Sequence, residues 1–277
     1  MKVAGAGEIN FEPSTARRDT LLMTTLTDDR VRAAAAAPAR YFYFHMALAC
    51  TAVAFLGFAP TYWLPLAHRT FSASPIVHLH GLLFFTWTVF FAFQSWLAAS
   101  GRVARHRAIG MAGVSLATAM VIFGFLVSVH VMKQSAAIGQ TDAGLAFSIV
   151  PLSGIGFFAV VFSLAIANVR QAETHKRLML LAGISLLDAA VARWFLTFLA
   201  PAGPPGPPPV AVTLPPALIA YLLLVVAVVH DWRTRGRPHP VYVYGGIALI
   251  AVKILNLPVS MTPAWHNLAG GILRLAQ

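Results

Sequence analysis

Charged side chains are scarce in this chain of 277 residues. They make up 10% of it, against about 25% in a typical soluble domain, while 58% of the residues are hydrophobic. This balance excludes a soluble enzyme and a disordered protein. The one cysteine, Cys50, cannot close an internal disulfide, which excludes a disulfide scaffold.

Several motifs are also missing. The chain has no glycine-rich phosphate loop, no CxxC or CxxCH for thiol ligands or covalent haem, and no H-E-x-x-H for zinc. Acidic residues beyond the first forty positions are too few for carboxylate-bridged metal pairs or paired-carboxylate catalysis. They are Asp142, Glu173, Asp188 and Asp231.

Long apolar runs dominate what remains. A helix that crosses a bilayer needs about 20 such residues, and each run is continuously apolar, which favours helices over barrel strands. The sequence therefore predicts an all-α integral membrane protein with seven transmembrane helices, the second to fifth forming the core bundle. The runs are 42–66, 76–99, 109–131, 146–169, 178–200, 214–230 and 241–260.

Basic residues alternate between the loops, and this pattern predicts the orientation. The loops after the second, fourth and sixth runs face the cytoplasm, so the N-terminus is cytoplasmic and the C-terminus lies outside. The basic residues are too dispersed for a nucleic-acid surface, and the lipid bilayer of a bacterial inner membrane is the expected partner. The cytoplasmic loops hold Arg102, Arg105, Arg107, Arg170, Lys176, Arg177, Arg233, Arg235 and Arg237; the other loops and the tail hold Arg69, Lys133 and Arg274.

Two segments differ from the apolar runs in composition. Residues 1–40 have no apolar core and are expected to form a disordered cytoplasmic tail before the membrane domain, 41–277; Met23 is an alternative start. The proline-rich segment 201–216 is expected to be an extended spacer without regular hydrogen bonds.

The histidines sort by depth into two layers. His106 and His130 are 24 residues apart on one helix, or about 36 Å, so they belong to opposite faces. His78 and His80 lie about 200° apart on their helix, so only one of them faces a shared site, with His80 preferred. The outer layer is His78, His80 and His130; the inner layer is His45, His106, His175 and His230.

Imidazole is a ligand for haem iron, copper and zinc in apolar surroundings. We therefore expect His80 and His130 to bind a metal or haem near the outer face, and His106 and His175 to do so near the inner face. Haem b, copper or another metal is the expected cofactor. The alternative for each histidine is a simple hydrogen bond to a headgroup or a helix end.

Polar residues inside the apolar runs are functional candidates, because unpaired charges in a bilayer are costly. Gln94, Asp188 and Arg193 would orient or balance the bound group. Asp188 and Arg193 lie about 140° apart on one helix, so Asp188 is expected to meet a partner on another helix, with Lys253 as one option. Lys253 could instead extend its ammonium group outward to the interface.

Two strings carry a family resemblance. HLHGLLFFTWTVFFAFQSWLAASGRVARHRAIG (78–110) combines histidine, glutamine and HRxxG, and THKRLMLLAGISLLDAAVARW (174–194) combines HKRxM with a terminal arginine. Together they resemble an uncharacterised bacterial integral-membrane family, a domain of unknown function, and more distantly oxidase-assembly membrane proteins and transmembrane b-type cytochromes. The resemblance implies His80 or His78, Gln94, His106, His175 and Arg193 as its characteristic positions, but no activity.

Three functions follow as hypotheses. The leading one is a membrane redox or haem-handling protein that transfers electrons across the bilayer, with quinone or respiratory complexes as partners. The second is a small-substrate transporter that uses Asp188, Arg193 and Lys253, with Pro151 and Pro258 as signs of broken helices. The third is a non-catalytic assembly subunit of a larger membrane complex.

Overall fold

The apolar runs fold as helices in the computed structural model, which describes residues 40–200 and 206–276. The chain divides into the units Met1–Phe42 and Tyr43–Gln277. Of the first unit only residues 40–42 are described, and the expected tail, 1–40, otherwise lies outside the described residues. The second unit contains the helical bundle and all the candidate site residues.

Every regular element of the described chain is a helix, which confirms the predicted all-α class. Within residues 40–200 and 206–276, six helices are long and apolar enough to cross a membrane, or seven if the bent pair Arg40–Gly57 and Ala59–Ala67, with a bend of 41°, counts as one span. Each predicted run overlaps one of them. The other spans are Pro75–Ala99, Val103–Ala137, Thr141–Ala167, Ala172–Phe198, Val210–Arg235 and Pro240–Ser260.

The helices are divided further by local breaks. After the helix Arg40–Gly57, the elements in chain order are η1 (Ala59–Trp63), α2 (Leu64–Ala67), α3 (Pro75–Ala99), α4 (Val103–Ala137), α5 (Thr141–Ala167), α6 (Ala172–Ser185), α7 (Asp188–Phe198), η2 (Val210–Thr213), α8 (Leu214–Ala220), α9 (Leu222–Arg235), α10 (Pro240–Ser260) and α11 (Pro263–Leu275).

The proline-rich segment differs from its prediction. Residues 201–205 lie outside the described residues and 206–209 are irregular, but η2 begins at Val210 and α8 at Leu214. The expectation of an extended spacer through 216 is therefore wrong for its last seven positions. Pro215 and Pro216 fit the first turn of α8, where a helix needs no backbone N–H donor.

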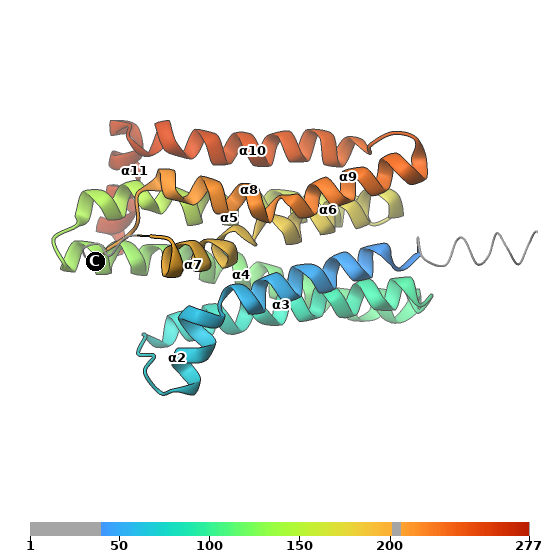
Figure 1. Cartoon of the computed structure of the whole chain (residues 1–277), viewed down its shortest axis with the longest axis horizontal. Helices are drawn as coiled ribbons and strands as arrows, with labels where there is room; N and C mark the ends of the chain where they lie inside the picture. Colours follow the sequence, from blue (N-terminus) through green and yellow to red (C-terminus); the bar gives the residue numbers. More distant parts are fainter. Residues whose placement is uncertain (1–39, 201–205, 277) are drawn as a thin grey trace, which may run out of the picture. The chain divides into compact units, whose positions relative to one another are not determined.

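The turns of the bundle fall at two ends. The turns from α3 to α4, from α5 to α6 and from α9 to α10 lie at one end, which we call the basic end because they carry the arginine-rich loops (Figure 1). The turns from α4 to α5 and from α10 to α11 lie at the other, the far end (Figure 1). The positive-inside rule predicts that the basic end faces the cytoplasm.

Helices α3 to α6 pack in sequence, and α10 packs against α5, α6, α8 and α9. Trp87 of α3 lies edge-on to Phe158 and Phe162 of α5, with ring centroids 5.3 and 5.4 Å apart. At the far end the unpredicted α11 packs on α4 and α5. Trp265 of α11 donates from its indole N–H to the Leu145 carbonyl at 2.9 Å. The core thus runs through α3 to α6, as predicted, and extends to α10 and α11.

Candidate functional site at the basic end

Two histidines from separate helices meet at the basic end. His106 of α4 and His175 of α6 have ring centroids 6.3 Å apart and ring planes at 81°. Nδ1 of His175 is 2.8 Å from the Ala165 carbonyl oxygen, and Nδ1 of His106 is 3.3 Å from the backbone oxygen of Gln94. A ring nitrogen that faces a carbonyl carries the proton, so in this tautomer each Nε2 keeps its lone pair for another partner.

The side chain of Gln94 reaches the same imidazole. Gln94 is buried in α3, and its carboxamide can turn so that the oxygen accepts from the Gly110 N–H at 3.3 Å. Its nitrogen then lies 2.8 Å from Nδ1 of His106 and can donate to it. Nδ1 cannot both accept from this amide and donate to the backbone oxygen. Gln94 therefore influences which nitrogen of His106 carries the proton.

The pair supplies two ligand atoms and no more. Among the described residues, no three His, Cys, Asp or Glu side chains gather where they could hold a metal ion. A zinc ion takes four ligands, so two imidazoles alone do not make a zinc site. Haem iron is different, because the porphyrin fills four positions and the protein adds axial ligands only.

The histidines of the outer layer do not come together. His80 stacks on Phe84 of its own helix with ring centroids 4.1 Å apart, and its Nδ1 is buried without a hydrogen-bond partner. His130 instead lies 2.9 Å from the Ser74 hydroxyl through Nε2. The described part of the chain shows no contact between His80 and His130. His78 pairs through Nδ1 with the Tyr62 hydroxyl, 3.1 Å away.

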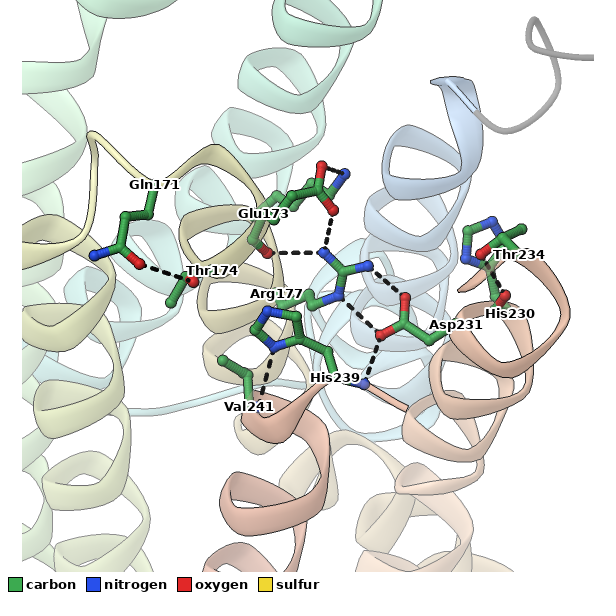
Figure 2. A network of polar contacts seen from close by, with 10 residues as sticks. Gln171, Glu173, Thr174, Arg177, His230, Asp231, Thr234, His239 and Val241 are labelled. Carbon is green, nitrogen blue, oxygen red and sulfur yellow. Dashed lines mark hydrogen bonds and ion pairs between the residues drawn. The ribbon is translucent and has the colours of Figure 1, made fainter. Parts of the chain in front are cut away.

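A buried ion-pair network joins α6 to α9 at the basic end (Figure 2). Arg177 donates from Nε and Nη2 to the two carboxylate oxygens of Asp231, at 2.8 and 2.5 Å. Its Nη1 donates to the Glu173 side chain at 2.6 Å, and the backbone N–H of His239 donates to Asp231 at 3.1 Å. The network was not predicted from the sequence. A signal was available, because each of the few acidic residues in an apolar chain needs a cationic partner.

His239 lies in the loop between α9 and α10, beside the network. Burial disfavours its imidazolium and, together with the nearby Arg177 and Arg235, holds the pKa of His239 below its ordinary value. Its neutral Nδ1 accepts from the Val241 N–H at 3.2 Å and so caps the start of α10.

The intramembrane charges lie nearer the far end. Asp188, at the start of α7, forms an ion pair with Lys253 of α10, as the sequence suggested for a partner on another helix. Lys253 is 5% exposed, so it does not extend outward to the interface. Arg193 lies over the ring of Phe58, with its guanidinium carbon 5.3 Å from the centroid.

No family model matches the chain, and no curated protein or solved structure is similar enough to count as a match. The helices alone define the class: this is a multi-pass helical membrane protein.

Proposed function

We propose that the protein is a membrane redox or haem-handling protein whose metal centre is bound by His106 and His175. The observation that carries the proposal is the convergence of two imidazoles from α4 and α6, with each Nδ1 near a backbone carbonyl. Such a second hydrogen bond is what orients the histidine ligands of metals and fixes their tautomer.

The spacing of the rings supports a shared metal. Two imidazoles that bind one ion from opposite sides, at about 2.0–2.1 Å from each nitrogen, have centroids roughly 6 Å apart. The observed separation is 6.3 Å. The cofactor is haem b, whose iron needs only axial ligands from the protein, or a copper ion of low coordination number.

The partners follow from this location. A centre at the basic end would exchange electrons with a quinone or a respiratory complex in a bacterial inner membrane. His80 and His130 have other partners in this structure, so the proposal depends on the His106–His175 centre alone. Transfer across the whole bilayer would require a second centre near the far end.

An absorption spectrum of the purified protein, reduced minus oxidised, tests the proposal together with metal analysis. We expect a Soret band, or bound copper without one, and loss of the signal in both His106→Ala and His175→Ala. His266→Ala is the matched control, because His266 lies at the far end and pairs with the Ser260 carbonyl. A parent protein with neither haem nor metal contradicts the proposal.

A further inference from the structure

Two charged side chains from different helices meet within the depth of the bilayer, and a buried tyrosine lies at the same depth. Asp188 begins α7, Lys253 lies in α10, and Tyr221 separates α8 from α9. Measured along their helices from the basic end, all three lie about 20–24 Å deep at 1.5 Å per residue. The hydrocarbon core is about 30 Å thick, so these groups are well inside it.

Hydrogen-bond donors are left over at this position. Lys253 makes its ion pair with one Asp188 oxygen, and the other oxygen accepts from the Ala189 N–H at 2.8 Å. Among the described residues, the hydroxyl of Tyr221 has no hydrogen-bond partner, although the residue is only 4% exposed. A buried donor without an acceptor is unfavourable, so we expect these groups to bind a small acceptor such as water.

A polar path leads from this position toward the far end. Lys253, Asn256 and Ser260 share one buried face of α10, at spacings of three and four residues. The Asn256 amide donates to the Ser153 hydroxyl of α5 at 2.9 Å. Both residues line a groove of about 490 Å³ between α5, α10 and α11. Asn256, one helical turn from Lys253, therefore connects the buried polar face of α10 to this groove.

Toward the basic end the same face of α10 is closed by apolar packing. Leu249, one turn from Lys253, is 2% exposed. A Cβ atom at Gly245 would overlap the side chain of Leu181 of α6, and one at Gly246 would lie 2.9 Å from Leu224 of α9. The helices thus contact each other closely here and leave no polar route from the basic end along this face.

We propose that Asp188, Lys253 and Tyr221 form an intramembrane proton-exchange site that opens to the far end along the polar face of α10. The N–H bond of the Lys253 ammonium breaks and its proton bonds to the Asp188 carboxylate, which leaves a neutral amine beside a neutral acid. Water at the far end takes the proton from the acid and returns one to the amine. Arg193 of α7 is a nearby fixed charge, and α5 contributes the neutral Ser153.

The site requires no metal and is independent of the histidine centre. Intramembrane ionisable pairs of this kind mark proton and ion pathways in transporters, and a helix broken at the site, as between α6 and α7, is typical of such proteins. A half-buried acid and a buried amine in direct contact, with a buried phenol at the same depth, are suited to exchanging protons, so the proton is the ligand of this site.

Infrared difference spectroscopy of the full chain, measured in H₂O and again in D₂O, tests the protonation step. We expect a protonated-carboxyl band that shifts in D₂O, is lost in Asp188→Asn and changes frequency in Tyr221→Phe. Asp142→Asn, which changes an exposed acid at the start of α5, should keep the band. A spectrum without a band that depends on Asp188 overturns the proposal.

Cysteine accessibility tests the one-sided path in a Cys50→Ala background. A membrane-impermeant thiol reagent should modify Asn256→Cys and Ser260→Cys when it is added from the far end only. Leu249→Cys, on the same face but within the apolar packing toward the basic end, is the matched control and should stay unmodified. Ser260→Cys is nearly isosteric, so its folding is not in question. Protection of Ser260→Cys from the far end, or modification of Leu249→Cys from either side, overturns the path.

Discussion

Arg177 and Asp231 form a two-point ion pair that joins α6 to α9, with contacts of 2.8 and 2.5 Å between residues 54 positions apart. The arginine is 2% exposed and the aspartate 0%. Two charges removed from water in this way depend on each other, because either one alone would be left buried without compensation. The pair is therefore a strong constraint on how α9 packs at the basic end.

Asp231→Asn should destabilise the protein by about 3 kcal/mol, the lower end of the range for breaking a buried pair. The substitution leaves the Arg177 guanidinium buried with one charged partner, Glu173, whose side chain is 58% exposed. Thermal unfolding in detergent, followed by circular dichroism, measures the loss.

Glu173→Gln is the control for that prediction. Because the Glu173 carboxylate is largely exposed, its loss should change stability by less than about 1 kcal/mol. Replacing both buried partners with apolar residues, as in Arg177→Met with Asp231→Leu, should recover much of the lost stability. Equal effects of Asp231→Asn and Glu173→Gln would contradict the assignment of a buried pair.

Below the ordinary pKa of histidine, the stability of the folded protein should decrease as the pH decreases, because of His239. Its pKa is lowered in the folded protein, chiefly by burial, so below about pH 6.5 the unfolded chain binds a proton that the folded chain does not. The stabilising contribution of neutral His239 is thus fully present above that pH and is lost as the pH decreases. Unfolding temperatures at about pH 7.5 and about pH 5.5 measure the difference.

His239→Asn keeps the cap of α10 but removes the group that titrates. Asparagine keeps a side-chain acceptor for the Val241 N–H but does not bind a proton in this range, so the pH dependence should become shallower. His68→Asn, in the exposed turn after α2, should leave it unchanged. An identical pH profile for His239→Asn and the parent would show that another group is responsible.

The spans follow from the sequence because an apolar run of sufficient length has one favourable structure in a bilayer. The breaks do not follow as easily. The interruption at 186–187 falls on two leucines, with neither proline nor glycine to mark it. The helix α11 is short and amphipathic, so it resembles a tail until Trp265 and Leu273 are seen to pack on α4 and α5.

The candidate site was only partly predictable for a related reason. Depth along a helix can be counted, so His106 and His175 could be placed at one end from the sequence. Which helices are neighbours cannot be derived from such a count. The separation of His80 from His130, and the pairing of Arg177 with Asp231, depend on helix rotation and packing, which the apolar pattern of a membrane helix specifies weakly because lipid-facing and protein-facing residues are alike.

Gly57→Ala should destabilise the contact between the first helix and α7 by about 1–3 kcal/mol through overpacking. A Cβ atom at Gly57 would lie 2.6 Å from the Ala190 carbonyl oxygen, a backbone atom that cannot move aside cheaply. Gly156→Ala is the matched control in α5, where a Cβ atom meets nothing within 4 Å. The control should be neutral or slightly stabilising, since alanine favours helix. Unfolding temperatures that fall equally in both variants would contradict the close contact.

Gln94 should tune the proposed metal centre through the tautomer of His106. In Gln94→Glu a carboxylate replaces the amide and accepts from the Nδ1–H of His106, which favours the tautomer with a free Nε2 lone pair and makes the imidazole a stronger ligand. We expect tighter metal binding and a lower reduction potential than in the parent. Gln94→Leu removes the amide that donates to Nδ1 of His106, so the Nδ1–H keeps the Gln94 backbone oxygen as its acceptor and Nε2 stays free. We therefore expect metal affinity to be unchanged or higher in Gln94→Leu. Equilibrium metal titration and redox potentiometry measure both effects. A centre indifferent to Gln94→Glu would mean that His106 is not a ligand.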